Sequence, residues 1–282
     1  MAQIELKNVN YIYSQGTNNE AKALNDINLK IESGEFLAII GHTGSGKSTL
    51  IQLMNGLLKC ASGEVLIDGK NIDEKGFNKI DLRRKVGIVF QNPENQLFEE
   101  TVLKDVCFGP KNLGLSNEEA EKKAIEALET VGVPKEFYHS SVFELSGGQK
   151  RRVAIAGVLA MEPDILILDE PTSGLDPKGR NMIMDKIQKL HQEKGVGIVW
   201  VSHNMEQVAK HAKRIVVMNE GEIVFDDDAK SVFAKSDELE KIGLKCPQIS
   251  VIMNKLKEAG MDVDTSIINV EEAKDNLLKI LK

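Results

Sequence analysis

At residues 41–48 the chain reads Gly41-His42-Thr43-Gly44-Ser45-Gly46-Lys47-Ser48. This stretch fits the pattern G-x-x-x-x-G-K-S, in which glycines let backbone N–H groups curl around a phosphate without clashes from Cβ atoms. An apolar run, Phe36 to Ile40, precedes it, and a helical pattern from Thr49 to Leu58 follows it. Because a helix N-terminus attracts anions, this order predicts a nucleoside triphosphate site. There Lys47 is expected to bridge the β- and γ-phosphates, and the Ser48 hydroxyl to ligate Mg²⁺.

Two adjacent carboxylates, Asp169 and Glu170, end a second apolar run, Ile165 to Leu168. Ligands bind at the carboxyl edge of a parallel sheet, so we expect the pair beside the phosphate loop if the two strands are neighbours. Asp169 is expected to hold Mg²⁺ directly or through water, and Glu170 to orient and deprotonate the attacking water. An isolated acidic pair after a strand is more often a solvated strand end, but the phosphate loop upstream reverses that preference.

The apolar pattern predicts a mixed α/β fold. Runs of strand length that suit a parallel sheet buried between helices occur at Phe36 to Ile40, Val86 to Phe90, Ile165 to Leu168 and Gly197 to Val201. Alternating patterns that suit antiparallel strands occur at Asn25 to Ile31 and Glu64 to Asp68. A hairpin is expected at Arg214 to Phe225, an inserted helix at Asn117 to Val131, and two amphipathic helices at about Gln248 to Ala259 and Val270 to Leu281.

Composition excludes several classes of protein. The chain has 282 residues, with 36 Lys and Arg against 43 Asp and Glu, for a net charge of −7. No global basic field therefore holds nucleic acid or anionic lipid. Cys60, Cys107 and Cys246 are widely spaced and lack ligand spacing, which indicates unpaired thiols in a reducing cytosol. No apolar run approaches the ~18 residues of a membrane span, so we expect a cytosolic, non-spanning chain.

A further motif, Leu145-Ser146-Gly147-Gly148-Gln149, is followed by Lys150-Arg151-Arg152 and a helical pattern. With this signature the sequence resembles the ATP-binding cassette (ABC) ATPases over about Ile4 to Phe225. The resemblance implies a P-loop NTPase cassette of the α/β class, with a mainly parallel sheet core, an antiparallel β subdomain, a helical signature subdomain and a small C-terminal helical appendage. It places the cassette at residues 1–228, its helical subdomain at about 92–162, and the appendage at 229–282.

The resemblance also assigns roles to residues. Gln91 resembles the Q-loop glutamine, Pro171 to Asp176 the D-loop, and His203 the switch histidine near the γ-phosphate. Tyr13 stands where the family stacks an aromatic ring on adenine, with Tyr11 as the alternative. Catalysis is thus assigned to Glu170, His203 and Gln91, and Mg²⁺ binding to Ser48, Gln91 and Asp169. ATP binding is assigned to Tyr13, Gly41, His42, Thr43, Gly44, Ser45, Gly46, Lys47, Ser48, Thr49, Ser146, Gly147, Gly148 and Gln149.

The signature implies a second cassette. Ser146 and the following glycines open a helix and so form another anion site. In ABC proteins the signature of one cassette closes over the γ-phosphate held by the other, which gives a head-to-tail dimer with two ATP molecules at the interface. Hydrolysis removes that contact, and the dimer loosens.

Several stretches resemble the energy-coupling factor (ECF) ATPases, formerly grouped with cobalt transporter ATPases: residues 41–46, 90–102, 105–110 and 242–247. In that family two similar ATPases usually pair, and His42 marks this chain as resembling the second type. The resemblance implies a transmembrane coupling protein docked near Gln91, with Leu97 and Phe98 in contact, and a separate membrane protein that binds a vitamin or metal ion. It implies a peripheral location at the cytoplasmic face of the cell membrane.

Other ABC functions form the alternative class. ABC ATPases that act on nucleic acid insert coiled coils or zinc-binding segments, and ribosomal types join two cassettes in one chain, whereas this sequence has none of these features. The sequence therefore favours an importer ATPase, with another importer class as a further alternative. It leaves open the transported solute and the choice between a homodimer and a heterodimer.

Overall fold

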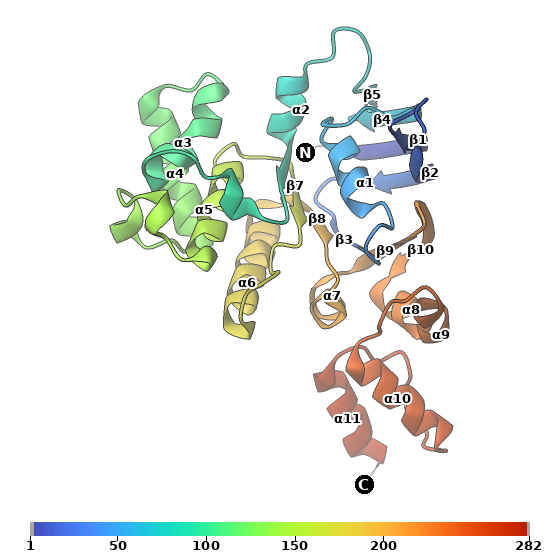
Figure 1. Ribbon diagram of the computed structural model, residues 1–282. Helices are drawn as coiled ribbons and strands as arrows, with labels where there is room; N and C mark the ends of the chain where they lie inside the picture. The colour runs from blue at the N-terminus through green and yellow to red at the C-terminus, as the bar shows by residue number, and fades with distance from the viewer. Residues whose placement is uncertain (1–2, 281–282) are drawn as a thin grey trace.

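The computed structural model describes residues 3–280, whose strands form two sheets (Figure 1). The six-stranded sheet has the order β10-β9-β3-β8-β7-β6. Its strands are β3 (Phe36–Gly41), β6 (Val86–Val89), β7 (Ile165–Asp169), β8 (Gly197–Val201), β9 (Arg214–Asn219) and β10 (Glu222–Asp228). All neighbouring pairs are parallel except β9 and β10, which form the expected hairpin. Every residue of β3, β7 and β8 is buried, as in a sheet covered on both faces.

The four-stranded sheet is antiparallel and has the order β2-β1-β4-β5. Its strands are β1 (Ile4–Tyr13), β2 (Ala21–Ile31), β4 (Ser62–Ile67) and β5 (Lys70–Asn71). Both antiparallel segments expected from alternation lie in it, and the mixed α/β class with its two kinds of sheet is confirmed.

Helices cover both faces of the larger sheet and form two further groups. They are α1 (Lys47–Met54), α2 (Lys79–Lys85), α3 (Val102–Asn112), α4 (Asn117–Val131), α5 (Gly147–Leu159), α6 (Pro177–Lys194), α7 (Met205–His211), α8 (Ala229–Ala234), α9 (Ser236–Lys241), α10 (Gln248–Glu258) and α11 (Val270–Ile280). Three short 3₁₀ turns are η1 (Pro93–Gln96), η2 (Lys135–Phe137) and η3 (Val142–Glu144). None of the helices between residues 3 and 280 has both the length and the apolar character needed to cross a bilayer.

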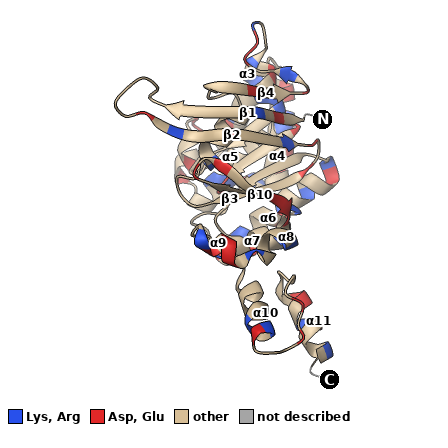
Figure 2. Cartoon of the chain, turned by 90° about the vertical axis from the view of Figure 1, so that its right-hand side faces the viewer, with Lys and Arg blue, Asp and Glu red and all other residues tan. Residues whose placement is uncertain are grey.

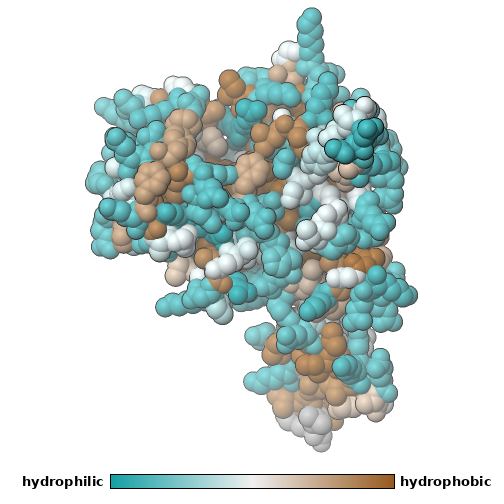
Figure 3. Space-filling model, viewed as in Figure 1, coloured by the Kyte–Doolittle hydropathy of each residue, from teal (hydrophilic) through white to brown (hydrophobic). Residues whose placement is uncertain are grey.

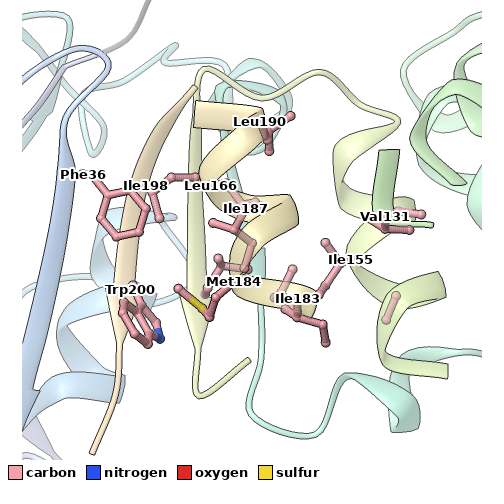
Figure 4. Close-up of a cluster of buried hydrophobic side chains, with 14 of the residues drawn as sticks. Phe36, Val131, Ile155, Leu166, Ile183, Met184, Ile187, Leu190, Ile198 and Trp200 are labelled. Carbon is pink, nitrogen blue, oxygen red and sulfur yellow. The ribbon is translucent and has the colours of Figure 1, made fainter. Parts of the chain in front are cut away.

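Alternation along β3 divides the hydrophobic interior into two cores. Phe36, Ala38 and Ile40 face one core, whereas Leu37 and Ile39 face the other. Figure 4 shows the first core, where Phe36 and Trp200 on the strands lie on the side of the sheet that α6 covers. The second core lies between the larger sheet, α1 and the antiparallel sheet. The phosphate loop that follows β3 is therefore anchored by a strand buried on both sides.

Helices α10 and α11 project beyond α8 and α9, as the side view in Figure 2 shows. They enclose a small core of their own, made by Met253, Val263, Ile267 and Ala273. Both helices match the expected amphipathic segments, although Leu281, the expected end of the last one, lies outside the described residues. The domain boundaries at residues 92, 162 and 228 stay predictions.

The first helix is shorter than its apolar pattern predicts. It begins at Lys47 and ends at Met54 instead of continuing to Leu58. The Asn55 side chain donates a hydrogen bond to the Val86 carbonyl, and Gly56 adopts a φ of 68°. The helix ends here although apolar residues follow. It is stopped by a side chain that bonds to another strand and by a glycine in the left-handed conformation.

Candidate functional site

A cleft of about 880 Å³ opens at the carboxyl edge of the larger sheet. It is lined by residues from the phosphate loop, from the ends of the strands and from the antiparallel sheet: Tyr13, Gly41, His42, Thr43, Gly44, Gly46, Lys47, Ser48, Thr49, Gln91, Asp169, Glu170 and His203. Ser45, also in the phosphate loop, is fully buried and does not line the cleft. The structure thus brings together nearly all of the sequence-predicted residues except the signature.

The signature lies in a separate hollow. Ser146, Gly148 and Gln149 line a depression of about 200 Å³ together with Leu175 and Asp176. The Gln149 side-chain oxygen accepts hydrogen bonds from the Ser146 backbone N–H and hydroxyl, both at 2.8 Å. This capping box begins helix α5 and leaves its first turn facing outward.

The phosphate loop holds a cation at its centre. The Lys47 ammonium donates to the backbone carbonyls of Gly41 at 2.8 Å and His42 at 2.7 Å. Burial lowers the pKa of Lys47, and the nearby carboxylates Glu170 and Asp169 oppose that shift. The loop therefore presents a positive charge at the start of a helix, where backbone N–H groups also favour an anion.

Gly46 precedes helix α1 with a φ of 101° and is closely surrounded. A Cβ atom there would lie 2.7 Å from the Ala23 carbonyl oxygen and 2.8 Å from a methyl carbon of Leu24. Both the left-handed conformation and the contact with β2 thus require glycine.

We expect Gly46→Ala to lower the free energy of unfolding by about 1–3 kcal/mol more than Gly16→Ala does, because overpacking adds to backbone strain. Gly16 is the matched control, since its φ of 79° is similar but nothing lies within 4 Å of its Cβ position. Urea titration of both variants measures the difference. Equal losses in the two variants would contradict the close approach at Gly46.

Asp169 reaches the phosphate loop although its strand is not adjacent to β3. Strand β8 lies between β3 and β7, so the two strands are not neighbours and the condition placed on this prediction is not met. The Ser48 hydroxyl nevertheless lies 3.4 Å from Oδ2 of Asp169. Two strand spacings amount to about 10 Å, which the start of α1 and two side chains span.

The pair of Ser48 and Asp169 suits a magnesium ion. Mg²⁺ prefers oxygen ligands and commonly takes only one or two from a protein, with phosphate oxygens and water completing its shell. Asp169 is buried, and burial raises the pKa of its carboxyl group while Ser48 and Lys47 oppose the shift. Within residues 3–280 no three His, Cys, Asp or Glu side chains gather as a larger metal site.

Glu170 and His203 form a second pair in the cleft. Nδ1 of His203 lies 2.6 Å from Oε1 of Glu170. Glu170 is 7% exposed and has a φ of 51°, and its backbone N–H donates to the Val201 carbonyl at 3.0 Å. Burial raises the pKa of Glu170, which brings a carboxylate base closer to neutral pH, while the hydrogen bond with His203 opposes the shift. A left-handed conformation in a bulky residue is strained and turns this carboxylate away from the strand direction.

The two candidate tyrosines differ in their surroundings. Tyr13 is 41% exposed, lines the cleft, and its hydroxyl lies 3.0 Å from the Thr49 hydroxyl. Tyr11 packs against the second core and meets the Tyr13 ring edge-on, with centroids 4.8 Å apart. The ring of Tyr13 is the one available to a ligand in the cleft.

Two further segments line the cleft, and no local pattern in the sequence places them there. Residues 21–23 of β2 border the cleft, as do Gly243, Leu244 and Lys245 in the segment before α10. The Gln248 backbone N–H donates to Glu206 at 2.7 Å, and Glu206 lies in the first turn of α7, three residues after His203. Only tertiary structure brings these segments to the cleft.

Comparison with known proteins identifies relatives along most of the chain. The "ABC transporter" family model matches residues 24–173. The energy-coupling factor transporter ATP-binding protein EcfA2 of Clostridium tetani is 54% identical over 98% of this chain and 96% of its own length. EcfA2 of Clostridium perfringens is also 54% identical, over 99% of this chain and 98% of its own length.

Two solved structures share the fold. The structure of cbiO1 from Clostridium perfringens, described as part of the ABC transporter complex cbiONQ, has a TM-score of 0.75 and 42% identity, and covers 89% of this chain and 98% of that one. The dimeric, post-hydrolysis cassette MJ0796 bound to ADP and Pi has a TM-score of 0.73 and 36% identity, and covers 80% and 98% of the two chains.

Proposed function

Since the chain belongs to the ABC transporter family and is an ATP-hydrolysing subunit of an energy-coupling factor transporter, we propose that it works as a pair with a second cassette. Binding of Mg·ATP closes the pair, and hydrolysis opens it. This cycle drives uptake of a vitamin or transition-metal ion. The observation that carries the proposal is the convergence of the phosphate loop, Asp169 and the Glu170–His203 pair on one cleft. It supports in-line attack of water on a bound γ-phosphate.

In the proposed mechanism Lys47 and the loop N–H groups bind the β- and γ-phosphates, and Tyr13 stacks on adenine. Ser48, Asp169 and Gln91 would hold Mg²⁺, which neutralises charge that develops on the phosphate oxygens. These assignments rest on the lining of the cleft and on oxygen donors that suit magnesium.

Glu170 is proposed to accept a proton from the attacking water. His203 holds the carboxylate through a 2.6 Å contact and so fixes its direction. A general base within hydrogen-bonding reach typically contributes about 10²–10⁴-fold to the rate.

A second ATPase is proposed to complete each site. The signature hollow and the nucleotide cleft have no lining residue in common, which supports use of Ser146 to Gln149 by a nucleotide on another cassette. The similar cassette MJ0796 is a dimer in its structure with ADP and Pi. We favour a heterodimer with a similar ATPase, as the ECF resemblance implies.

The appendage offers a further surface for pairing. Ile252, Val270 and Leu278 are 48%, 62% and 48% exposed, and Figure 3 shows apolar residues gathered over α10 and α11. Burial of such side chains between two appendages would help hold the ATPases together.

We propose that a transmembrane coupling protein docks beside Gln91 on an aromatic patch, defined as Phe98 and Phe108. These rings are 57% and 43% exposed and meet edge-on with centroids 4.7 Å apart. Leu97, expected to share this contact, is only 8% exposed and packs into the first core, so that expectation is wrong. The Asp105 carboxylate accepts the N–H groups of Phe98 and Glu99 at 2.9 and 3.0 Å, which fixes the loop.

We expect Phe98→Ser to weaken retention of the transmembrane subunit by about 30-fold, as loss of an aromatic anchor worth about 2 kcal/mol would. ATP affinity should not change, because Phe98 lies outside the cleft. Ile80→Ser is the control, since Ile80 is 60% exposed on α2. Co-purification with the tagged chain measures retention, and full retention by Phe98→Ser would count against the patch.

The proposed location is the cytoplasmic face of the cell membrane, where the coupling protein holds the chain peripherally. Purification of the assembly with its membrane subunits, followed by mass spectrometry and a Mg²⁺-dependent ATPase assay, tests the proposed function. We expect a second ATPase and a substrate-binding membrane protein to co-purify, and the solute bound to the latter identifies the cargo. An assembly that hydrolyses ATP but contains no membrane subunit would contradict the proposal.

A further inference from the structure

Arg151 on the signature helix α5 is a buried cation whose contacts converge on the nucleotide cleft. Arg151 as a whole residue is 5% exposed. One terminal nitrogen, Nη1, donates to the backbone carbonyls of Pro171, at 3.5 Å, and Ser173. The other, Nη2, donates to the Gln91 carbonyl at 3.5 Å and to the Glu94 carboxylate at 3.4 Å. A single guanidinium therefore reaches three separate segments.

Two of these segments carry cleft residues. Gln91 lies two residues after the end of β6, whereas Pro171 and Ser173 lie in the loop that follows Glu170, just after the end of β7. Strands β6 and β7 are parallel neighbours, so their following loops leave the sheet side by side. Arg151 lies between these loops and bonds to the backbone of both.

The third segment leads to the aromatic patch. Glu94 lies in η1, three residues before Leu97 and four before Phe98. Its side chain is 30% exposed, whereas that of Arg151 is 6% exposed. Within residues 3–280 Arg151 has no second acidic partner, so this ion pair with one buried member is expensive to break. The chain of contacts thus runs from η1 through Arg151 to the backbone beside Glu170.

The neighbouring Arg152 serves as an internal comparison. Its Nη1 lies 3.4 Å from the Gly132 carbonyl and 3.3 Å from the Met182 sulfur, both outside the nucleotide cleft. Consecutive arginines on one helix therefore point to different parts of the molecule. Of these two arginines, Arg151 is the one that bonds to the loops that follow β6 and β7.

We propose that Arg151 is a positioning residue, which holds the Q-loop, the loop after Glu170 and the signature helix in one fixed arrangement. The proposal rests on the roles of Gln91 and Glu170 in the proposed function. A planar guanidinium with two forked nitrogens satisfies several carbonyl and carboxylate oxygens at once, which a lysine ammonium does less well. Movement of η1 is transmitted through the Arg151 guanidinium to Gln91 and to the loop after Glu170, the two segments that face the reacting water.

We expect Arg151→Gln to lower kcat for ATP by about 10- to 100-fold, the loss that a small misplacement of reacting groups causes. The Kd for an ATP analogue should not change, because Arg151 does not line the cleft. The Mg²⁺ concentration for half-maximal turnover should rise, since Gln91 is displaced. Arg151→Lys keeps the charge and should recover part of kcat, and Lys122→Gln on the exposed face of α4 is the control.

Assays of the full chain within its purified assembly separate the possible outcomes. Unchanged kcat and an unchanged Mg²⁺ requirement in Arg151→Gln would overturn the proposal. A joint fall of Tm, ATP affinity and kcat without rescue by lysine would assign Arg151 a purely structural role and also overturn it. Normal turnover in Glu170→Gln would instead overturn the proposed base, so the two failures are distinguishable.

Glu94→Gln provides a second test if Arg151→Gln does not fold. The amide keeps the shape of Glu94 but removes the charge that pairs with Arg151. We expect a smaller fall of kcat with the same rise in the Mg²⁺ requirement. Wild-type values for both quantities would contradict the transmission of movement from η1 to the cleft.

Discussion

Replacement of Glu170 by glutamine is expected to lower ATP turnover by about 10²–10⁴-fold, the usual contribution of a general base. The amide retains the size of the carboxylate and its reach to His203, but it cannot accept the proton from water. ATP binding and ATP-dependent pairing of cassettes should persist, because Lys47 and the phosphate loop are intact. Steady-state phosphate release and light scattering measure the two properties.

Glu193→Gln is the matched control for this change, since Glu193 is exposed on α6 and does not line the cleft. It should hydrolyse ATP at the parent rate. Hydrolysis at the parent rate by Glu170→Gln would show that the assigned base is wrong.

Lys47→Ala is expected to raise the Kd for ATP by about 10- to 100-fold, because a hydrogen bond to a charged group contributes about 1.5–3 kcal/mol. The ammonium is held between the carbonyls of Gly41 and His42, at the position where a phosphate enters the loop. Its removal also leaves Asp169 and Glu170 without their neighbouring cation, which further disfavours a polyanion.

A titration with a fluorescent ATP analogue measures this effect. Lys59→Ala is the control, because Lys59 is exposed and outside the cleft. Parent affinity in Lys47→Ala would contradict its assigned contact with the β- and γ-phosphates. The two variants thus separate binding from the chemical step.

Local chemistry explains why several elements could be predicted from the sequence. The helix at Asn117–Val131 has the expected bounds because a capping box at Ser116 begins it and a left-handed Gly132 ends it. The strands Phe36–Gly41 and Gly197–Val201 were recognisable because both faces are apolar. The phosphate loop was recognisable because its glycines and lysine have a fixed spacing.

Features that depend on long-range packing could not be predicted. The insertion of β8 between β3 and β7 is a property of sheet order, which no local pattern encodes. Leu97 and Phe98 are adjacent apolar residues, yet only the fold decides that the first is buried and the second exposed. Arg151 stands beside a similar arginine, and its role emerges only from contacts with residues up to 60 positions away.

We propose that this chain supplies complementary parts of two ATP sites, its cleft for one and Ser146 to Gln149 for the other. The most direct test measures ATP-dependent pairing by light scattering, with the partner ATPase or between copies of this chain. It compares the Glu170→Gln chain with a chain that carries both Glu170→Gln and Ser146→Arg. We expect Ser146→Arg to abolish pairing and to leave the Kd for ATP of the single chain unchanged. ATP-dependent pairing that survives Ser146→Arg would contradict the proposal.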